Sequence, residues 1–352
     1  MSFEQRRACV ECGSTFIART ANRVRCDSCR AARIRERSHV LLSEQECQVC
    51  GKVFKPYRSK QVTCGDATCQ RERFNQTRTP ERDEQIEKLF RYYKARDSLS
   101  VDNLKDGTRV LITGDHQLPF VDEDFEEAKQ RFIADWKPGV IVLNGDVIDA
   151  YELSEYDKRP SRMFNLEDEI NQAKQLVADY KRLSGGVVYW VDGNHEERLQ
   201  RIIWKKAQEF SFLVADLPEA LELEKTTAGF VPYGQHVDLH GFVITHGTIA
   251  RMHSAYTAKA MMDRYRSSGC NGHTHRIGSH SITDHRGVSH TWFETGCSCR
   301  KDLEYMKAAP NWQHGFLIGE IYDGALHPSL IRVIEAKGRR GFVAGGNYYR
   351  IK

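Results

Sequence analysis

The sequence VIVLNGDVID, at residues 140–149, decides the fold of the larger part of this 352-residue chain. Its first half is an apolar run closed by a glycine, which is typical of a short buried strand, and Asp146 and Asp149 follow directly. Similar runs occupy residues 109–113 and 187–191, with helical periodicity near 123–135 and 167–183 between them. This alternation of strand and helix predicts an α/β fold with a parallel sheet.

Four further polar motifs resemble GDVID at 145–149 in following an apolar run. They read GDHQ at 114–117, GNHE at 193–196, THG at 245–247 and GHTH at 272–275. Open α/β sheets hold their functional residues just beyond the strand ends, so Asp115, Asp146 and Asn194 should lie close together. The later apolar runs suggest a second sheet packed face to face on the first; they are 242–245, 268–271, 289–294 and 315–321. Carboxylate, amide and imidazole groups in this number can hold two metal ions about 3.5–4 Å apart, an arrangement suited to attack on a phosphate ester.

The five motifs, in this order, resemble those of the calcineurin-like metallophosphoesterases of phage and bacterial type, over roughly residues 108–322. The resemblance implies a two-sheet αββα sandwich and a hydrolase with two divalent ions, for which Mn, Fe, Zn or Ni suit the mixed oxygen and imidazole ligands. Asp146 would bridge the ions. The implied ligands of the first ion are Asp115, Gln117 and His275, and those of the second are Asn194, His246 and His273. His195 would act as an acid beside the leaving oxygen, and Asp149 would orient it.

The first motif departs from the family pattern at Gln117, where the family has histidine. His116 is a poor substitute, because a shift of one residue turns the side chain away from the site. Gln117 could coordinate through its amide oxygen, a weaker donor than imidazole. A weakened or empty first site is the alternative interpretation.

The first 70 residues contain a tandem repeat of paired cysteines. The repeat unit Cys-x2-Cys-Gly-x2-Phe begins at Cys9 and again at Cys47, and thirteen residues separate the cysteine pair of each unit from a second cysteine pair. The two expected sets are Cys9, Cys12, Cys26 and Cys29, and Cys47, Cys50, Cys64 and Cys69. Four thiolates in two paired loops fit tetrahedral structural zinc, and disulfides are the weaker interpretation in a chain that begins without a secretion signal. We therefore expect two zinc ribbons.

Charge divides the chain unevenly. Residues 1–80 carry 16 Lys and Arg, thirteen of them Arg, against 8 Asp and Glu, whereas residues 81–352 carry 36 against 40. Arginine binds phosphate in a bidentate manner, so the imbalance favours nucleic acid as a partner, with solvated surface as the alternative. Two four-thiolate zinc sites would cancel about half of the surplus of eight charges. The expected domains are ribbons at 1–38 and 39–78, a helical connector at 79–107 and a metallophosphoesterase domain at 108–352.

These features predict a metal-dependent phosphoester hydrolase that acts on nucleic acid as a phosphodiesterase or nuclease. Alternatives are a phosphomonoesterase for a nucleotide or phosphoprotein, and a non-catalytic binding module with a degenerate metal site. Arg251, Lys259 and Arg264, on a helix expected at 250–265, could contact substrate phosphate or could form a solvated face. The polar N-terminus and the lack of a long apolar run predict a cytoplasmic protein without a membrane segment. The oligomeric state stays open.

Overall fold

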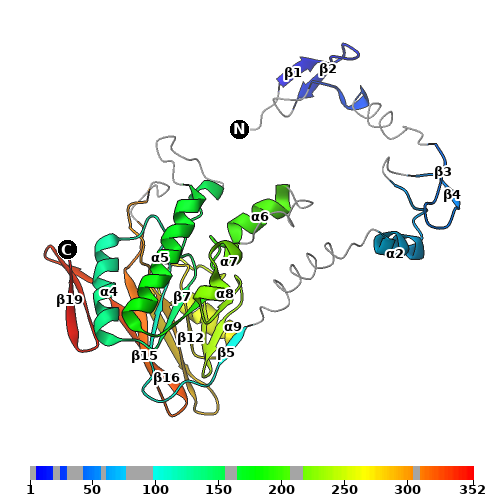
Figure 1. The fold of residues 1–352 in the computed structure, drawn as a ribbon. Coiled ribbons are helices and arrows are strands. Elements are labelled where there is room, and N and C mark those ends of the chain that lie inside the picture. Colours follow the sequence, from blue (N-terminus) through cyan, green and yellow to red (C-terminus); the bar gives the residue numbers. More distant parts are fainter. Residues whose placement is uncertain are drawn as a thin grey trace. The chain divides into compact units, whose positions relative to one another are not determined.

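The computed structural model describes residues 5–18, 24–29, 43–56, 61–76, 98–154, 165–206, 217–303 and 310–352 (Figure 1). The chain forms two compact units, Met1–Glu84 and Gln85–Lys352, which are considered separately below. Most of the helical connector expected at 79–107 lies outside the described residues.

The first unit contains two hairpins with the same turn. Strands β1 (Gln5–Ala8) and β2 (Thr15–Ala18) pair antiparallel, as do β3 (Gln45–Glu46) and β4 (Val53–Phe54). The backbone N–H of Gly13 donates to the carbonyl of Cys9 at 2.9 Å, and Gly51 donates to Cys47 in the same way at 2.9 Å. Helix α2 (Ala67–Gln76) begins just before the last cysteine of the second repeat. The repeated sequence therefore folds into repeated structure.

The second unit is built around a six-stranded sheet with the order β16-β15-β6-β7-β8-β9. Strands β6 (Arg109–Thr113), β7 (Val140–Asn144), β8 (Val187–Val191) and β9 (Gly229–Val231) are parallel. Strands β15 (Gly315–Tyr322) and β16 (Ala325–Arg332) complete the sheet as an antiparallel edge. The run at 315–321 was expected in the second sheet, and this was wrong, because β15 pairs with β6 of the first sheet. The three strands expected from the first apolar runs have the predicted bounds.

A second six-stranded sheet has the order β13-β14-β12-β11-β10-β5. Its strands are β5 (Leu99–Val101), β10 (Val237–Leu239), β11 (Phe242–Thr245), β12 (Gly269–Asn271), β13 (Ile277–Thr283) and β14 (Ser289–Thr295). Strands β11, β12 and β14 run parallel to one another.

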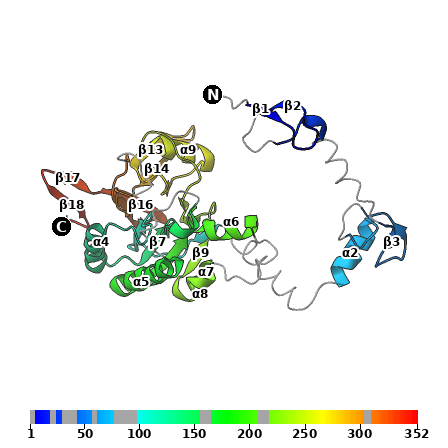
Figure 2. The ribbon, with the colours of Figure 1, turned by 90° about the horizontal axis from the view of Figure 1, so that it is seen from above.

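The sheets pack face to face and are covered by helices on their outer faces (Figures 1 and 2). One apolar cluster joins alternate residues of both sheets, such as Val110 and Val142 with Leu239 and Ile244. The neighbouring residues of the first sheet point outward to α4 (Glu123–Trp136) and α5 (Leu166–Ser184). Helix α9 (Tyr256–Tyr265) covers the outer face of the second sheet through Met261 and Met262. The αββα sandwich is thereby confirmed.

The remaining elements complete the second unit. The short helices are η1 (Tyr151–Leu153), α6 (Glu197–Lys206), α7 (Leu217–Ala220) and α8 (Leu223–Thr226). A three-stranded sheet of β17 (Ile334–Ala336), β18 (Arg339–Ala344) and β19 (Asn347–Ile351) packs on α4 through contacts such as Tyr349 on Phe132. One boundary was wrong: α9 begins at Tyr256, and Arg251 precedes it.

Candidate metal centre

Both sheets bring their predicted motif residues to one place. Asp115, Asp146 and Asn194 follow the carboxyl ends of β6, β7 and β8, while His246 follows β11 and His273 and His275 follow β12. The ligand atoms of Asp146, His246 and His273 lie within 4.8 Å of one another, and so do those of Asp115, Asp146 and His275. Asp146 belongs to both groups, as expected of a carboxylate between two ions.

Short contacts between electron-pair donors define the two groups. The His246 Nε2 atom lies 3.2 Å from Asp146 Oδ2 and 3.2 Å from Asn194 Oδ1. The His275 Nε2 atom lies 3.1 Å from Asp115 Oδ1. Asn194 is half-buried, and the other residues in these contacts are buried.

Gln117 lies beside the first group. Its side-chain amide nitrogen is 3.3 Å from His275 Nε2, and the residue is only 2% exposed. The nitrogen and oxygen of an amide exchange places on a flip of the side chain, so the amide oxygen can occupy the same position. Gln117 thus faces the group as the sequence predicts. His116 faces elsewhere, with its Nε2 atom 3.2 Å from Lys129 Nζ and 3.3 Å from the Tyr180 hydroxyl.

The hydrogen bonding of His246 shows that these donors fit a cation. Its Nδ1 atom lies 2.9 Å from the carbonyl oxygen of Asn144, which only accepts, so Nδ1 carries a proton. In the neutral ring Nε2 then presents a lone pair to the oxygens of Asp146 and Asn194. Three lone pairs directed at one another require either a cation or an added proton, and a second hydrogen bond of this kind typically orients metal-binding histidines.

Without a cation, protons can occupy the lone pairs of these imidazoles, and the pKa values show which rings take them up. Burial lowers the pKa of His246, but the carboxylate of Asp146 outweighs it and raises the pKa to about 9. Burial is likewise outweighed at His275, where Asp115 raises the pKa to about 10. Burial and the neighbouring His246 lower the pKa of His273 to about 4. A divalent ion would replace the protons on His246 and His275.

The backbone of the motifs is held in an unusual conformation. Five of the seven predicted ligands have left-handed φ angles between 47° and 66°; they are Asp115, Gln117, Asp146, His273 and His275. Such angles carry strain and gather at functional sites. The motif glycines allow close approach as well: a Cβ atom at Gly193 would lie 2.1 Å from Asp146 Oδ1, and one at Gly272 would lie 2.4 Å from Asp115 Oδ2.

Glu196 supports the centre in a role that the sequence analysis missed. Its buried carboxylate accepts backbone N–H groups from Val147 and Ile148 at 2.7 and 3.1 Å, and from Asp146 and Gly193 at 3.0 and 2.8 Å. Glu196 therefore fixes the loop that carries Asp146. Its position in the GNHE motif was the available signal.

Lys129 of α4 supports the first motif from behind and was also missed. The side chain is fully buried, and its Nζ atom lies 2.8 Å from both Glu126 Oε2 and Ser298 Oγ. It also lies 3.1 Å from Thr113 Oγ1 and 3.2 Å from His116 Nε2. Thr113 and His116 flank Asp115 closely in the chain, so this network fixes the backbone there. Nothing in the pattern of α4 distinguishes Lys129 from a surface lysine.

His195 and Asp149 are paired as predicted. The His195 Nδ1 atom lies 2.9 Å from the backbone oxygen and 3.0 Å from the Oδ1 atom of Asp149, and both are acceptors, so Nδ1 carries a proton. The His195 backbone N–H donates to Asp146 Oδ1 at 3.0 Å, which places the ring at the edge of the centre. Burial lowers the pKa of His195, and the charges of Asp146 and Asp149 raise it above its usual value. Arg198 was not predicted; its Nη2 atom lies 2.9 Å from His195 Nε2.

The predicted phosphate-binding cations have other contacts. Lys259 pairs with Asp263 at 2.8 Å, and Arg264 donates to the Thr248 hydroxyl at 2.9 Å. Arg251 is exposed in the segment before α9. Their role as substrate ligands stays a prediction.

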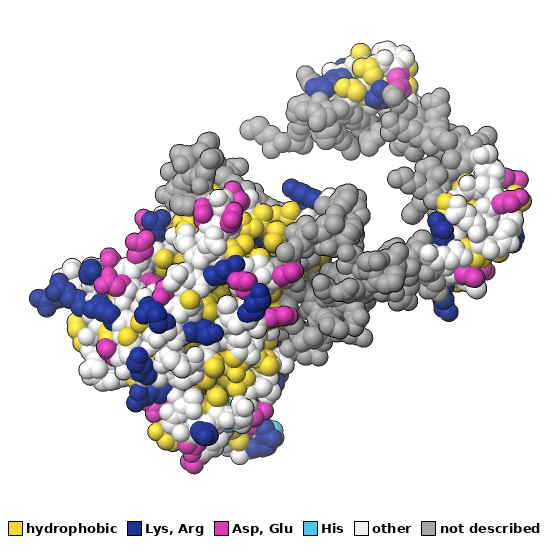
Figure 3. Space-filling model, viewed as in Figure 1, with side chains coloured by type: hydrophobic (Ala, Val, Ile, Leu, Met, Phe, Trp, Pro, Cys, Tyr) yellow, Lys and Arg dark blue, Asp and Glu magenta, His cyan; other side chains and the backbone are white. Residues whose placement is uncertain are grey.

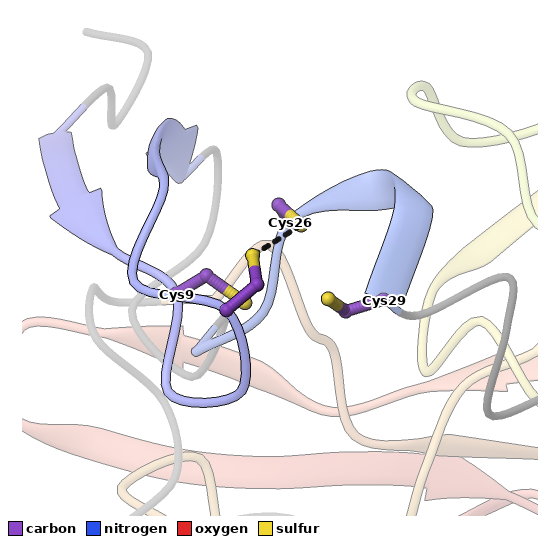
Figure 4. A group of neighbouring side chains, drawn as sticks. Cys9, Cys26 and Cys29 are labelled. Carbon is purple, nitrogen blue, oxygen red and sulfur yellow. Dashed lines mark hydrogen bonds between the residues drawn. The ribbon is translucent and has the colours of Figure 1, made fainter.

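The two cysteine sets of the first unit each gather four sulfur atoms within 4.8 Å of one another. Figure 4 shows Cys9, Cys26 and Cys29 converging on one point. The Cys12–Cys26 and Cys50–Cys64 sulfur distances are 3.7 and 3.9 Å. Tetrahedral zinc with bonds of about 2.3 Å sets its sulfur atoms about 3.8 Å apart, so both sets fit zinc ribbons.

Comparison with known proteins identifies the second unit. A family model described as Calcineurin-like phosphoesterase matches residues 108–291, more than half of the chain. The chain belongs to the calcineurin-like phosphoesterase family. It is therefore a metallophosphoesterase, a hydrolase of phosphoester bonds with divalent ions in its active site, and the motif resemblance is confirmed.

Two phage proteins are similar to this phosphoesterase. A Gene 54 protein of Mycobacterium phage D29 is 27% identical over 245 residues, which cover 64% of this chain and 94% of that protein. A Gene 54 protein of Mycobacterium phage L5 is 25% identical over 240 residues, with the same coverage of 64% and 94%.

Solved structures resemble the phosphoesterase only weakly. Vacuolar Protein Sorting 29 from Cryptosporidium parvum is 14% identical, with 70% of this chain and 96% of that chain covered and a TM-score of 0.35. The purple acid phosphatase PPD1 from yellow lupin is 11% identical, with 64% and 51% covered and a TM-score of 0.31. Scores this low add nothing to the assignment. None of the described helices is both long and apolar enough to cross a membrane.

Proposed function

We propose that this phosphoesterase hydrolyses phosphodiester bonds in nucleic acid, and that its zinc ribbons direct it to that substrate. The charge of the first 80 residues carries this proposal, since they contain 16 Lys and Arg but only 8 Asp and Glu. Exposed cations of the described part include Arg6, Lys52, Lys55 and Arg71. A basic segment in the same chain as a phosphoesterase fits a polyanionic substrate better than a small phosphomonoester.

We assign the ligands of the two ions from the two groups of donors. Asp115, Gln117 and His275 hold the first ion, Asn194, His246 and His273 hold the second, and Asp146 contributes to both. Mixed oxygen and imidazole donors suit Mn, Fe, Zn or Ni. Bound together, two such ions neutralise phosphate charge and make a water molecule a stronger nucleophile at neutral pH.

The side chains beside the ions handle the leaving group. His195 is placed to donate a proton to the leaving oxygen, and Asp149 holds the ring through its Nδ1–H. Proton donation requires a proton on Nε2, where the Arg198 guanidinium now lies 2.9 Å away. Arg198 must therefore turn away from His195, and a substrate phosphate is a suitable new partner for it.

The proposal is tested by comparing three substrates with added Mn²⁺. These are bis(p-nitrophenyl) phosphate, p-nitrophenyl phosphate and end-labelled DNA or RNA. Turnover of nucleic acid and the small diester supports the proposal, whereas turnover of the monoester alone refutes it in favour of a phosphomonoesterase. Metal analysis should find two zinc ions and two further ions per active chain.

The targeting role of the ribbons needs its own test. Nucleic-acid binding by the full chain should weaken steeply with salt, because cations that contact phosphates release counterions. A chain without residues 1–80 should bind less tightly and show a smaller salt dependence. Unchanged affinity after the deletion would exclude the ribbons as the targeting element.

A further inference from the structure

A cavity of about 700 Å³ is lined in part by Arg198, the residue that contacts His195 Nε2. Among the described residues, its lining includes Leu153, Ser154, Arg198, Arg201, Ile202, Trp204 and Lys205. Leu153 closes η1, which begins two residues after Asp149, and the other wall is α6, which begins two residues after His195. Both walls thus continue from the two residues that handle the leaving group.

One lining residue, Arg198, connects the cavity with His195. Arg198 donates to the backbone oxygen of Asp149 at 2.6 Å and lies 2.9 Å from His195 Nε2. Arg198 also lines the cavity, so a group bound there lies one side chain away from His195.

Three cations follow one face of α6 along the cavity. Arg198, Arg201 and Lys205 are spaced by three and four residues, which places them on the same side of a helix. They span about 10 Å at 1.5 Å per residue, close to the rise of three nucleotides at about 3.4 Å each. Helix α6 contains one acidic residue, Glu197, against four cations.

The opposite face of α6 anchors it, and one aromatic ring remains at the cavity. Ile203 is buried and Leu199 packs against the main core, so the helix cannot turn its cations inward. Trp204 lines the cavity and is 38% exposed. Rings of this kind stack with nucleic-acid bases at sites that track a backbone. Positive and negative side chains are interspersed over much of the face of the second unit in Figure 3, so a row of cations along one groove is a local feature.

We infer that this cavity binds the nucleic-acid strand on the leaving-group side of the scissile phosphate. Arg198, Arg201 and Lys205 contact phosphates along the strand, and Trp204 stacks with a base. The inference rests on the proposed function and adds to it a defined subsite and direction. A small phosphomonoester would not need a row of cations that extends along α6 beyond His195.

The test uses the full chain with Arg201→Gln, and Lys206→Gln as its matched control. Lys206 is on the same helix and is exposed, but it does not line the cavity. The measured quantity is kcat/KM for a single-stranded oligonucleotide divided by kcat/KM for bis(p-nitrophenyl) phosphate. Arg201→Gln should lower this ratio roughly fivefold to tenfold, as expected for one lost charge-assisted contact. Arg201→Gln should also reduce the slope of log(kcat/KM) for the oligonucleotide against log[salt] by about one unit relative to Lys206→Gln.

The outcomes separate this inference from the function on which it rests. If wild type cleaves oligonucleotides and the two variants have the same ratio, the subsite is refuted and the nuclease function stands. If wild type cleaves no oligonucleotide, both are refuted. The subsite also requires kcat/KM to rise over about three nucleotides on the leaving side and then level off; no dependence on that length would overturn it.

Discussion

Lys129→Met should destabilise the second unit by about 3–5 kcal/mol, the usual cost of breaking a buried ion pair by removing one partner. Lys129 is fully buried, and Glu126, 2.8 Å from it, is 7% exposed. Methionine keeps much of the apolar stem but leaves the Glu126 carboxylate without its countercharge. The hydroxyls of Thr113 and Ser298 lose the ammonium group at 3.1 and 2.8 Å at the same time.

Part of that cost belongs to the isolated charge rather than to the pair. Glu126 still accepts the Tyr180 hydroxyl at 2.8 Å in the variant, so it is not left without hydrogen bonds. Neutralising it as well, in Lys129→Met with Glu126→Gln, should restore stability relative to the sum of the single variants. We expect a coupling of about 1–3 kcal/mol, typical of residues in one network.

Urea denaturation followed by tryptophan fluorescence measures the effect. All five tryptophans lie between residues 136 and 312, so the signal reports the second unit and excludes the ribbons. Loss of less than about 1 kcal/mol in Lys129→Met, or strict additivity in the double variant, would refute the account of Lys129 as a buried countercharge. Mn²⁺ affinity should fall in the same variant, because Thr113 and His116 adjoin the Asp115 loop.

Three further predictions concern the centre itself. Gln117→His should tighten the weaker Mn²⁺ site about tenfold and Gln117→Ala should loosen it, since imidazole is a stronger donor than an amide; equal affinities in titration calorimetry would exclude residue 117 as a ligand. Gly193→Ala should lower kcat/KM at least a hundredfold while circular dichroism stays unchanged, because its Cβ would lie 2.1 Å from Asp146 Oδ1; near-normal activity would contradict that crowding. The pKa values of His246 and His275 are raised to about 9 and 10, so metal affinity should rise with pH until those values are passed. The stability of the metal-free protein should fall as pH rises through the same values. Metal titrations by calorimetry in buffers of different ionisation enthalpy measure the released protons, and no proton release would refute this prediction.

The sequence was sufficient to bound the first three strands of the parallel sheet and to place the candidate ligands after strand ends, and the reason is local. A buried parallel strand is an uninterrupted apolar run, so β7 at Val140–Asn144 could be bounded to the residue. Each ligand then follows its strand within a few residues. Their convergence follows from the rule that strand ends meet at one edge of a sheet.

The residues that support the centre, such as Lys129 and Arg198, could not be found in that way. Their partners are distant in the sequence, or the residues themselves are of a type that is common on protein surfaces. Lys129 reaches Ser298, 169 residues away, and its helix shows no pattern that marks a buried cation. Arg198 follows the GNHE motif by two residues, and nothing in its type shows that it contacts His195. The start of α9 was misplaced for a related reason: Ala255 adopts a left-handed φ of 70°, and alanine gives no sign of this.

The two groups of donors are unequal, and this orders the binding of the ions. The second group offers an amide oxygen, two imidazoles and Asp146, with Nδ1 of His246 fixed by the carbonyl of Asn144 at 2.9 Å. The first group has the neutral amide of Gln117 where the family has an imidazole, and its His275 Nδ1 atom lies 3.6 Å from the sulfur of Cys299, a weaker partner than a carbonyl. A ligand that is less firmly oriented, beside a weaker donor, binds its ion less tightly. The second ion should therefore bind first, and activity should follow the occupancy of the site that contains Gln117.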